Sequence, residues 1–332
     1  MSDSFLPDAR LLLCDLQNTI RDALQTARAT DAASGFADIA AVTQADTIYQ
    51  IDKVSEDAIT QWFETTWPHD EPVELVMEGI EEDENLVFPL GARETKWKCI
   101  LDPIDGTRNI MYDKRSAWSL AALAPQRGAD NRLSDLCVAA MTELPTAKMW
   151  RADQISGVHG AEFVCQSVNV LNGEVTPLAI APSGASDFRH GFASLARFFP
   201  EGKALTAQLE ERLWDEIYGL GSSASPLVFD DQYISTGGQL YELMVGHDRM
   251  LGDLRPLSLA KLGFDSSLVC HPYDICTGFL FQQAGGVLEA PDGSPLDAPL
   301  DTVSPIAWMG YANQTLAQTV RPILARLIGE ML

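Results

Sequence analysis

The stretch Asp102-Pro103-Ile104-Asp105-Gly106-Thr107-Arg108-Asn109 decides how this chain folds. The apolar, β-prone run of residues 97–101 leads into it and predicts a strand. The chain is then expected to turn at Pro103 and Gly106 and to begin a helical turn at Thr107. Two carboxylates three positions apart therefore face a common point at the end of a strand.

Two such carboxylates, with no basic residue between them, repel each other unless something holds them together. A divalent cation does so, and hard carboxylate oxygens without Cys or His favour Mg²⁺ or Mn²⁺ over Zn²⁺. The backbone N–H groups of Gly106 and Thr107 at a helix start offer a place for a phosphate. Metal and phosphate sites side by side indicate metal-assisted phosphoryl chemistry. The alternative for a bare pair of acids is a turn with one capping Asp and one solvated Asp.

The composition is that of a large, acidic protein. Its 332 residues are 46% hydrophobic, which is enough for one large domain or two joined ones. A formal net charge of −24 repels nucleic acids and anionic membranes, so neither is an expected partner. The apolar runs are shorter than a membrane span, and the start of the chain lacks the features of a signal peptide. Six scattered cysteines without a CxxC pair are typical of buried thiols, and we expect a cytoplasmic location.

The first half of the chain is expected to combine helices with an antiparallel-looking sheet. Apolar periodicity predicts amphipathic helices over residues 7–30 and 47–67. Strands are expected over residues 73–77, 97–101, 117–123, 136–141 and 148–151, with a turn at 157–163 that leads into another strand. The acidic run at residues 81–84 is interpreted as a solvated loop.

The residue pattern changes at residues 181–186, which predicts a boundary between two parts of the chain, residues 1–182 and 183–332. In the second part, short strands alternate with helices. Strands are expected over residues 192–199, 228–229, 287–288 and 306–309, and helices over 204–218, from 239, over 274–286 and over 313–327. The pair Gly285-Gly286 is interpreted as the C-terminal cap of the helix that begins at Asp274.

The eight residues from Asp102 to Asn109 resemble the DPxDGTxN signature of the inositol monophosphatase family, in the lithium-sensitive, Mg²⁺-dependent sugar-phosphatase superfamily. The resemblance implies a layered αβαβα sandwich, with an N-terminal α+β half, a C-terminal α/β half and the site between them. It implies a phosphoric monoester hydrolase that uses two or three Mg²⁺ ions, or Mn²⁺, and is inhibited by lithium. Family members are often homodimers, so a homodimer is expected.

A second segment is similar to the family's Trp-Asp-x-Ala-Ala-Gly signature with a later Ala-Gly-Gly. Here it reads Tyr273-Asp274-Ile275-Cys276-Thr277-Gly278, then Ala284-Gly285-Gly286, so Tyr replaces Trp and Cys-Thr replaces the small pair. Taken alone, Asp274 is better explained as a simple helix cap. Beside the first signature it is interpreted as a metal ligand.

The resemblance also assigns the metal ligands by position. Glu78 follows an apolar strand as the family's metal-binding Glu does, 24 positions before Asp102 (102 − 78), although the second Glu of the family pattern is Gly79 here. By similarity, one ion takes Glu78, Asp102 and the backbone carbonyl of Ile104. A second ion takes Asp102, Asp105 and Asp274.

The family places an Asp at the start of a helix, where it works with the Thr of the first signature to orient and deprotonate the attacking water. Asp52, which begins the run of residues 52–59, fits that pattern, and Thr107 is its partner. Asp46 also fits, because Val42-Thr43-Gln44-Ala45-Asp46 resembles the segment that usually precedes the Asp, six positions earlier (52 − 46). Asp52 is chosen because its downstream match is longer.

The substrate pocket is the least determined part. Ser235-Thr236-Gly237-Gly238 resembles a family segment that lines the pocket, so Ser235, Thr236 and Gly237 are expected to contact substrate, together with Gly106, Thr107 and Asp274. The segment from Asp253 to Tyr273, where the family has an acidic substrate contact, is lengthened and rewritten.

The function expected from these residues is Mg²⁺-dependent hydrolysis of a small sugar- or inositol-phosphate-like monoester by a metal-activated water. Alternatives within the superfamily are fructose-bisphosphate, histidinol-phosphate and 3′-phosphoadenosine nucleotide phosphatases. An alternative of another class is a non-catalytic metal-binding regulator. Intact acidic residues at both signatures argue against that last alternative.

Overall fold

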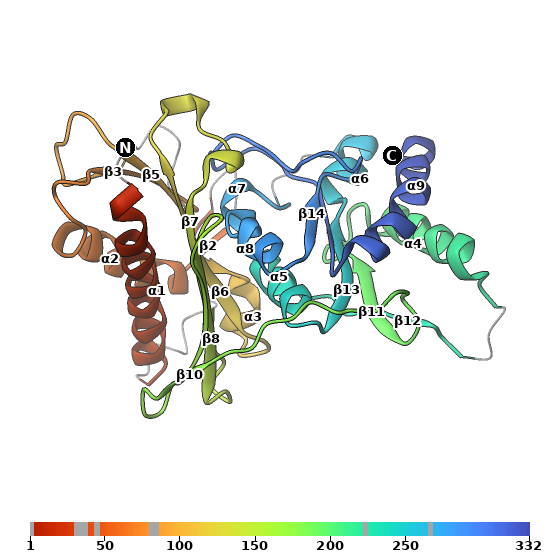
Figure 1. Ribbon diagram of the computed structural model, residues 1–332, viewed down its shortest axis with the longest axis horizontal. Helices are drawn as coiled ribbons and strands as arrows, with labels where there is room; N and C mark the ends of the chain where they lie inside the picture. The colour runs from red at the N-terminus through yellow and green to blue at the C-terminus, as the bar shows by residue number, and fades with distance from the viewer. Residues whose placement is uncertain (1–2, 30–38, 43–46, 80–85, 222–224, 265–267) are drawn as a thin grey trace.

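The computed structural model describes residues 3–29, 39–42, 47–79, 86–221, 225–264 and 268–332, with the backbone alone for residues 39–42 and 47–54. Helices and sheets alternate in five layers (Figure 1). From one side to the other these are a helix pair, a large sheet, a central helical layer, a smaller sheet and an outer helical layer. The predicted αβαβα sandwich is therefore confirmed.

The first layer consists of helices α1 (Leu6–Ala29) and α2 (Gln50–Thr65). In α1, Leu13, Leu16, Ile20 and Leu24 recur at helical spacing and are buried against the large sheet. The helix predicted over residues 7–30 is confirmed. The one predicted over 47–67 begins later, because residues 47–49 form the short strand β2 (Thr47–Tyr49), which pairs with β1 (Ile39–Val42).

The large sheet has eight strands in the order β10-β9-β8-β7-β6-β5-β3-β4. All neighbours are antiparallel except β3 and β5. The strands are β3 (Val73–Met77), β4 (Leu86–Phe88), β5 (Trp97–Asp105), β6 (Ala117–Pro125), β7 (Val138–Leu144), β8 (Arg151–Val158), β9 (Phe163–Asn169) and β10 (Val175–Pro177).

The strand predicted over residues 148–151 is wrong, because the chain forms β8 at Arg151–Val158 instead. Its central residues Asp153, Gln154 and Ser156 are polar, so the run does not resemble a buried strand. They are nevertheless buried, and side-chain hydrogen bonds satisfy them, for example Gln154 Nε2 to Thr142 Oγ1 at 2.8 Å.

The central layer lies between the two sheets and contains α5 (Thr236–Met244), α7 (Pro272–Ile275) and α8 (Gly278–Gln283). The helix predicted over residues 274–286 is thus two short helices. At the break the N–H of Leu280 bonds to Thr277 O, three residues back, which tightens the turn. The backbone at Gly278 packs so closely on β14 (Val287–Glu289) that a Cβ there would meet Leu288 at 2.4 Å.

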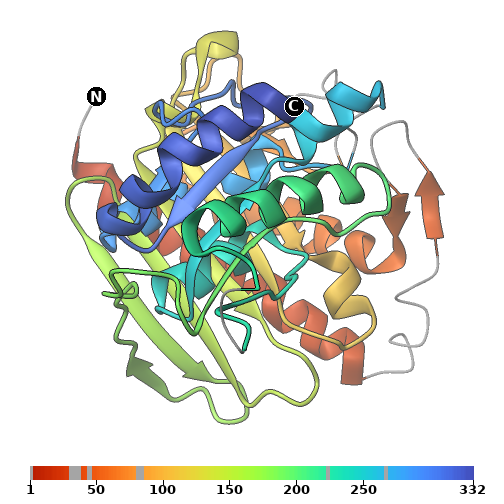
Figure 2. The same cartoon turned by 90° about the vertical axis from the view of Figure 1, so that its right-hand side faces the viewer.

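The smaller sheet has the order β12-β11-β13-β15-β14. Its other strands are β11 (Gly191–Leu195), β12 (Val228–Phe229), β13 (Asp248–Asp253) and β15 (Trp308–Tyr311). The outer helices α4 (Lys203–Tyr218) and α9 (Gln314–Met331) cover its far face, with α6 (Arg255–Leu262) beside them (Figure 2). The sequence missed β13 and α6, while α4, α9 and β12 lie where they were predicted.

The two sheets divide the chain at nearly the place that the sequence suggested. The last strand of the large sheet ends at Pro177 and the first strand of the smaller one begins at Gly191. We therefore keep a division at residues 182/183 as a proposal. A shared apolar core that includes Trp118, Leu240 and Phe281 fills the space between the sheets.

Candidate active site

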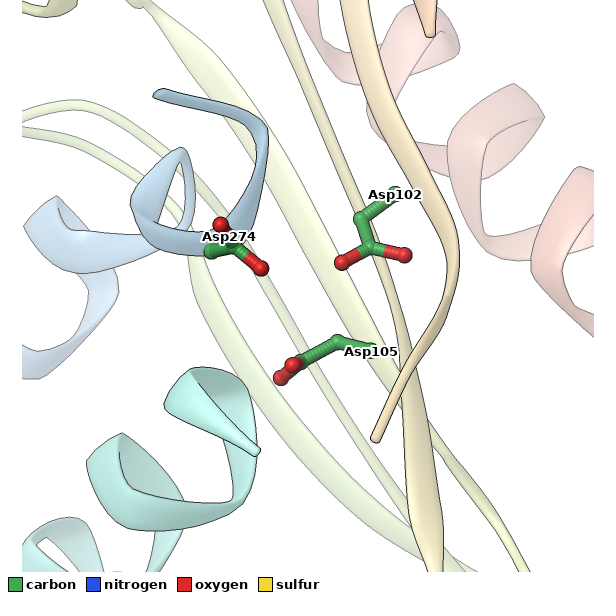
Figure 3. A group of neighbouring side chains, drawn as sticks. All are labelled: Asp102, Asp105 and Asp274. Atoms are coloured by element: carbon green, nitrogen blue, oxygen red, sulfur yellow. The ribbon is translucent and has the colours of Figure 1, made fainter. Parts of the chain in front are cut away.

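Three aspartates meet where the large sheet faces the central helical layer. Asp102 and Asp105 come from the end of β5, and Asp274 comes from α7 (Figure 3). One carboxylate oxygen of each lies within 4.8 Å of the others. Asp102 and Asp105 are 1% and 6% exposed, whereas Asp274 is partly exposed. Such a set of convergent carboxylate oxygens fits a hard divalent cation.

A bulge in β5 places Asp102 and Asp105 on the same side of the sheet. Asp102 is paired with Leu120 and Asp105 with Trp118, so β5 contains one residue more than β6 between these two pairs. In a regular strand, residues three apart point to opposite faces. The extra residue therefore turns both carboxylates toward the same point. The sequence predicted a turn at this position, but the strand continues through it to Asp105.

The start of α5 holds the carboxylate of Asp105. Oδ2 accepts hydrogen bonds from the Ser235 hydroxyl at 2.8 Å and the Gly237 N–H at 2.6 Å, and Oδ1 accepts one from the Thr236 N–H at 3.2 Å. Ser235 is the N-cap of this helix and also accepts the Gly238 N–H at 2.9 Å. The predicted pocket segment thus supports a carboxylate, and its contact with substrate stays a prediction.

The turn between β5 and α3 (Thr107–Met111) is fixed by its own side chains. The Ile104 N–H donates to Asp102 Oδ1 at 3.0 Å, and the Thr107 hydroxyl donates to Ile104 O at 2.8 Å. Asn109 Nδ2 donates to Ile234 O at 2.8 Å and ties this turn to the segment before α5. Gly106 has φ 92°, and a Cβ there would lie 2.9 Å from Ile234 O, so only glycine fits.

Asp274 is positioned by the segment before its own helix. The His271 N–H donates to Asp274 Oδ2 at 2.6 Å, and the Asp274 N–H donates back to His271 O at 3.1 Å. Pro272 sits in the first turn, where its missing N–H costs nothing. Asp274 therefore caps α7 and faces the other two aspartates at the same time.

Burial raises the pKa values of all three acids in the absence of a cation, and neighbouring charges add to the effect for Asp102 and Asp274. The pKa of Asp102 is raised by burial and by the charges of Glu78, Asp105 and Asp274. The pKa of Asp274 is raised by burial and by Asp105 and Glu78. Burial raises the pKa of Asp105 to about 6, against the lowering effect of its bonds to Ser235 and α5. A bound divalent cation would remove both penalties, so the donor set fits Mg²⁺ or Mn²⁺.

Glu78 belongs to the same site. It follows the last residue of β3, and its backbone N–H donates to Leu101 O of β5 at 3.3 Å. It lines the same pocket as Asp102, Ile104, Asp105 and Asp274, and its charge acts on two of these carboxylates. All five residues expected to bind metal therefore lie together.

The structure describes only part of the two general-base candidates, Asp52 and Asp46. Asp46 and the side chain of Asp52 lie outside the described residues, although the backbone of Asp52 is in α2. Glu56, one turn later in that helix, has its Oε1 only 3.6 Å from where a Cβ on Gly79 would be. The N-terminal part of α2 thus approaches the end of β3 beside Glu78.

The remaining wall of the pocket was not predicted. Phe198 and Phe199 follow β11, Arg255 begins α6, and Leu268 and Val269 precede α7. The sequence contains Asp253 and Arg255 two positions apart, which is a signal for an ion pair. Nothing in that spacing shows that the pair faces the metal ligands, because only the fold brings these segments together.

Ser235→Ala is expected to weaken Mg²⁺ binding as well as the fold. It removes the N-cap of α5 and the hydroxyl that holds Asp105, so unfolding should become easier by about 1–2 kcal/mol. Asn313→Ala is the matched control, because Asn313 caps α9 through the Leu316 N–H and is not among the residues that line the pocket. Calorimetry should show a loss of Mg²⁺ affinity for Ser235→Ala alone. Equal affinities would mean that Ser235 serves only as a cap.

Among the described residues, no helix combines the length and apolarity needed to span a bilayer. No protein-family model matches the chain, and no curated protein matches it. Solved structures do match it over almost their whole length.

Inositol monophosphatase from Anabaena (Nostoc) is 14% identical, with 99% of this chain and 96% of that one covered and a TM-score of 0.57. Fructose-1,6-bisphosphatase from Leishmania major is 14% identical, with 94% and 93% covered and a TM-score of 0.64. Extragenic suppressor protein SuhB from Bartonella henselae is 13% identical, with 98% and 100% covered and a TM-score of 0.65. The resemblance carried by the two signatures is confirmed at the level of the fold: this chain has the fold of the inositol monophosphatase and fructose-1,6-bisphosphatase superfamily.

Proposed function

We propose that this protein is a phosphatase that uses Mg²⁺ or Mn²⁺ to hydrolyse a small phosphate monoester of a sugar or polyol. The observation that carries the proposal is the convergence of Asp102, Asp105 and Asp274 beside the first N–H groups of α3. Carboxylates for cations and backbone donors for a phosphate thus meet in one pocket. The shared fold with inositol monophosphatase and fructose-1,6-bisphosphatase structures supports the same chemistry.

The proposed ligands divide between two positions that share Asp102. Glu78, Asp102 and the carbonyl of Ile104 would hold one ion, and Asp102, Asp105 and Asp274 a second. Ile104 O accepts the Thr107 hydroxyl and keeps a further lone pair for a cation. When bound, such ions neutralise phosphate oxygens and lower the pKa of coordinated water.

The remaining roles belong to the chain itself. Thr107 and Asp52 are proposed to orient the attacking water and to take its proton, with Asp46 as the other candidate for Asp52's role. The position of Glu56 beside Gly79 brings α2 to the site, as this role requires. The N–H groups of Gly106 and Thr107 are proposed to bind the phosphate, because donors in the first turn have no partner within a helix.

The direct test is phosphate release from a panel of sugar, inositol and nucleotide monophosphates with Mg²⁺, with EDTA, and with Mg²⁺ restored after EDTA. We expect release from at least one sugar or polyol phosphate, its loss in EDTA and its return with Mg²⁺. Release that EDTA leaves unchanged would contradict the metal assignment. If no compound in the panel releases phosphate but calorimetry detects Mg²⁺ binding, the non-catalytic metal-binding regulator would be favoured.

The fructose-bisphosphatase alternative has support of its own. The Leishmania structure matches this chain with a TM-score of 0.64, and a putative sedoheptulose-1,7-bisphosphatase from Toxoplasma gondii matches with 0.67. Bisphosphates therefore belong in the panel. Inhibition by lithium, a homodimer and a cytoplasmic location remain predictions of the family resemblance.

A further inference from the structure

The pocket wall that faces the carboxylates contains a buried arginine. Arg255 is 9% exposed and lines the pocket together with Phe198, Phe199 and Leu268. The two Phe residues follow β11, Arg255 begins α6 and Leu268 precedes α7, whereas the proposed phosphate donors lie at the junction of β5 and α3. The two sides of the pocket therefore present a cation and a set of acids to the same space.

The guanidinium of Arg255 is held rigidly. Its Nε donates to Asp253 Oδ1 at 2.9 Å, its Nη2 to Asp253 Oδ2 at 2.5 Å, and its Nη1 to Leu268 O at 2.8 Å. The guanidinium carbon Cζ also lies over two aromatic rings, 4.7 Å from the centre of the Phe198 ring and 5.5 Å from that of the Phe199 ring. The side chain is thus preorganised before any ligand arrives.

The guanidinium keeps unused donors. It carries five N–H groups, one on Nε and two on each Nη. The acceptors among the described residues take one N–H on each nitrogen, which leaves one on Nη1 and one on Nη2. A planar guanidinium can receive one carboxylate on one edge and a second anion on another.

Stability alone is a weak reason to keep this pair. Burying an arginine and an aspartate removes both from water, and well-packed apolar residues often stabilise a protein as much as a buried ion pair does. The neighbours Phe198, Phe199 and Leu268 already form an apolar wall that such residues would complete. An arginine at this place is better explained by a ligand that needs its charge.

We propose that Arg255 binds a second anionic group of the substrate, a carboxylate or a second phosphate. The substrate class would then be a phosphate monoester that carries another anion, and not a neutral polyol phosphate. This inference rests on the proposed function, because it assumes that the scissile phosphate is bound on the β5 side. Arg255 acts in it as a residue that determines specificity.

The test measures binding of phosphonates, which the enzyme cannot hydrolyse, by calorimetry in the presence of Mg²⁺. Methylphosphonate carries one anionic group. Phosphonoacetate, 3-phosphonopropionate and 4-phosphonobutyrate add a carboxylate at increasing distance, and 1,2-ethylenediphosphonate and 1,3-propylenediphosphonate add a second phosphonate. We expect at least one two-anion ligand to bind on the order of tenfold tighter than methylphosphonate, which corresponds to about 1.4 kcal/mol. If the carboxylate-bearing phosphonates bind tightest, the second anion is a carboxylate, and if the diphosphonates do, it is a phosphate. The length of the tightest-binding ligand gives the distance between the two anionic groups.

The variant pair Asp253→Asn/Arg255→Gln removes both charges without leaving either one buried alone. It should abolish the gain from the second anion and leave methylphosphonate binding unchanged. Glu289→Gln/Arg321→Gln is the matched control, because Arg321 makes the same two-bond pair with Glu289 outside the pocket. It should keep the gain. Arg255→Lys, which retains the charge without the planar fork, should keep part of it and serves if the double variant fails to fold.

Three results would overturn the proposal. The first is that no two-anion ligand binds tighter than methylphosphonate. The second is that the pocket variant loses affinity for methylphosphonate to the same degree, and the third is that the control variant loses the gain equally. The second result would mean that Arg255 binds the scissile phosphate itself. Because phosphonate binding is independent of turnover, a protein that hydrolyses nothing could still show the effect, so failure of the proposed function is recognised separately.

Discussion

Asp105→Asn is expected to abolish Mg²⁺-dependent phosphate release while the protein remains folded. The substitution removes a charge from the carboxylate set that it forms with Asp102 and Asp274. A ligand position should cost more than the ten- to hundredfold loss of metal affinity typical of groups that only support a ligand. We expect Mg²⁺ affinity to fall by about a hundredfold or more and kcat/KM by about a thousandfold or more.

The fold should survive because Asn keeps an acceptor oxygen for the start of α5. The N–H groups of Thr236 and Gly237 and the hydroxyl of Ser235 all point at this side chain. Asp153→Asn is the matched control: Asp153 lies on β8, is also buried, at 1% exposure, and is bonded to Ser167 of β9 and Tyr241 of α5. Circular dichroism, Mg²⁺ calorimetry and phosphate release should be measured on both. Near-normal turnover of Asp105→Asn would refute the metal assignment.

The same site shows what the sequence could predict. It identified Glu78, Asp102, Asp105 and Asp274 as one set, and the structure brings them together. The sequence did not predict why Asp102 and Asp105 face the same side of the sheet, because a turn was expected between them. They share that side through a bulge opposite Leu120 and Trp118, which depends on how β6 pairs with β5.

Elements whose polar residues are buried escaped prediction. β8 carries Asp153, Gln154 and Ser156 in its centre, and β13 begins and ends with Asp248 and Asp253. All five are buried, and the β8 residues have partners in distant parts of the chain, such as Arg10 for Ser156 and Tyr241 for Asp153. Hydrophobic periodicity detects strands that bury apolar side chains, and it does not detect strands whose buried side chains are polar and hydrogen-bonded. The wall that contains Arg255 was missed for another reason, because only the fold brings the segments after β11, at the start of α6 and before α7 to the same pocket.

The metal-free protein is expected to become less stable as the pH rises from about 4 to about 8. For Asp105 the pKa is 3.8 when unfolded and about 6 when folded. Between these values the native state binds more protons than the unfolded chain, so the free energy of unfolding falls as the pH rises. This difference of about 2 units corresponds to about 3 kcal/mol. Asp102 and Asp274, whose pKa values are also raised, act in the same direction.

Mg²⁺ should reverse this loss, since a bound cation replaces the protons that the carboxylates would otherwise hold. Chemical denaturation in EDTA and in Mg²⁺ should therefore give the largest difference at pH 8 and a small one at pH 5. Burial also raises the pKa values of Glu143 and Asp248 to about 7, and these groups add to the slope in EDTA. They lie outside the metal set, so only the part of the slope that Mg²⁺ removes belongs to the site.

Asp105→Asn provides a second test of the metal-free site, because it removes the buried charge whose loss of solvation raises the pKa of Asp105. In EDTA at pH 8 the variant should be more stable than the wild-type protein, by up to about 3 kcal/mol, and Mg²⁺ should add little. Asp153→Asn should show no such gain. A residue that destabilises the metal-free fold and is nevertheless present is explained by what it binds. Equal stability of Asp105→Asn and wild type at pH 8 without metal would show that the cluster carries no such strain.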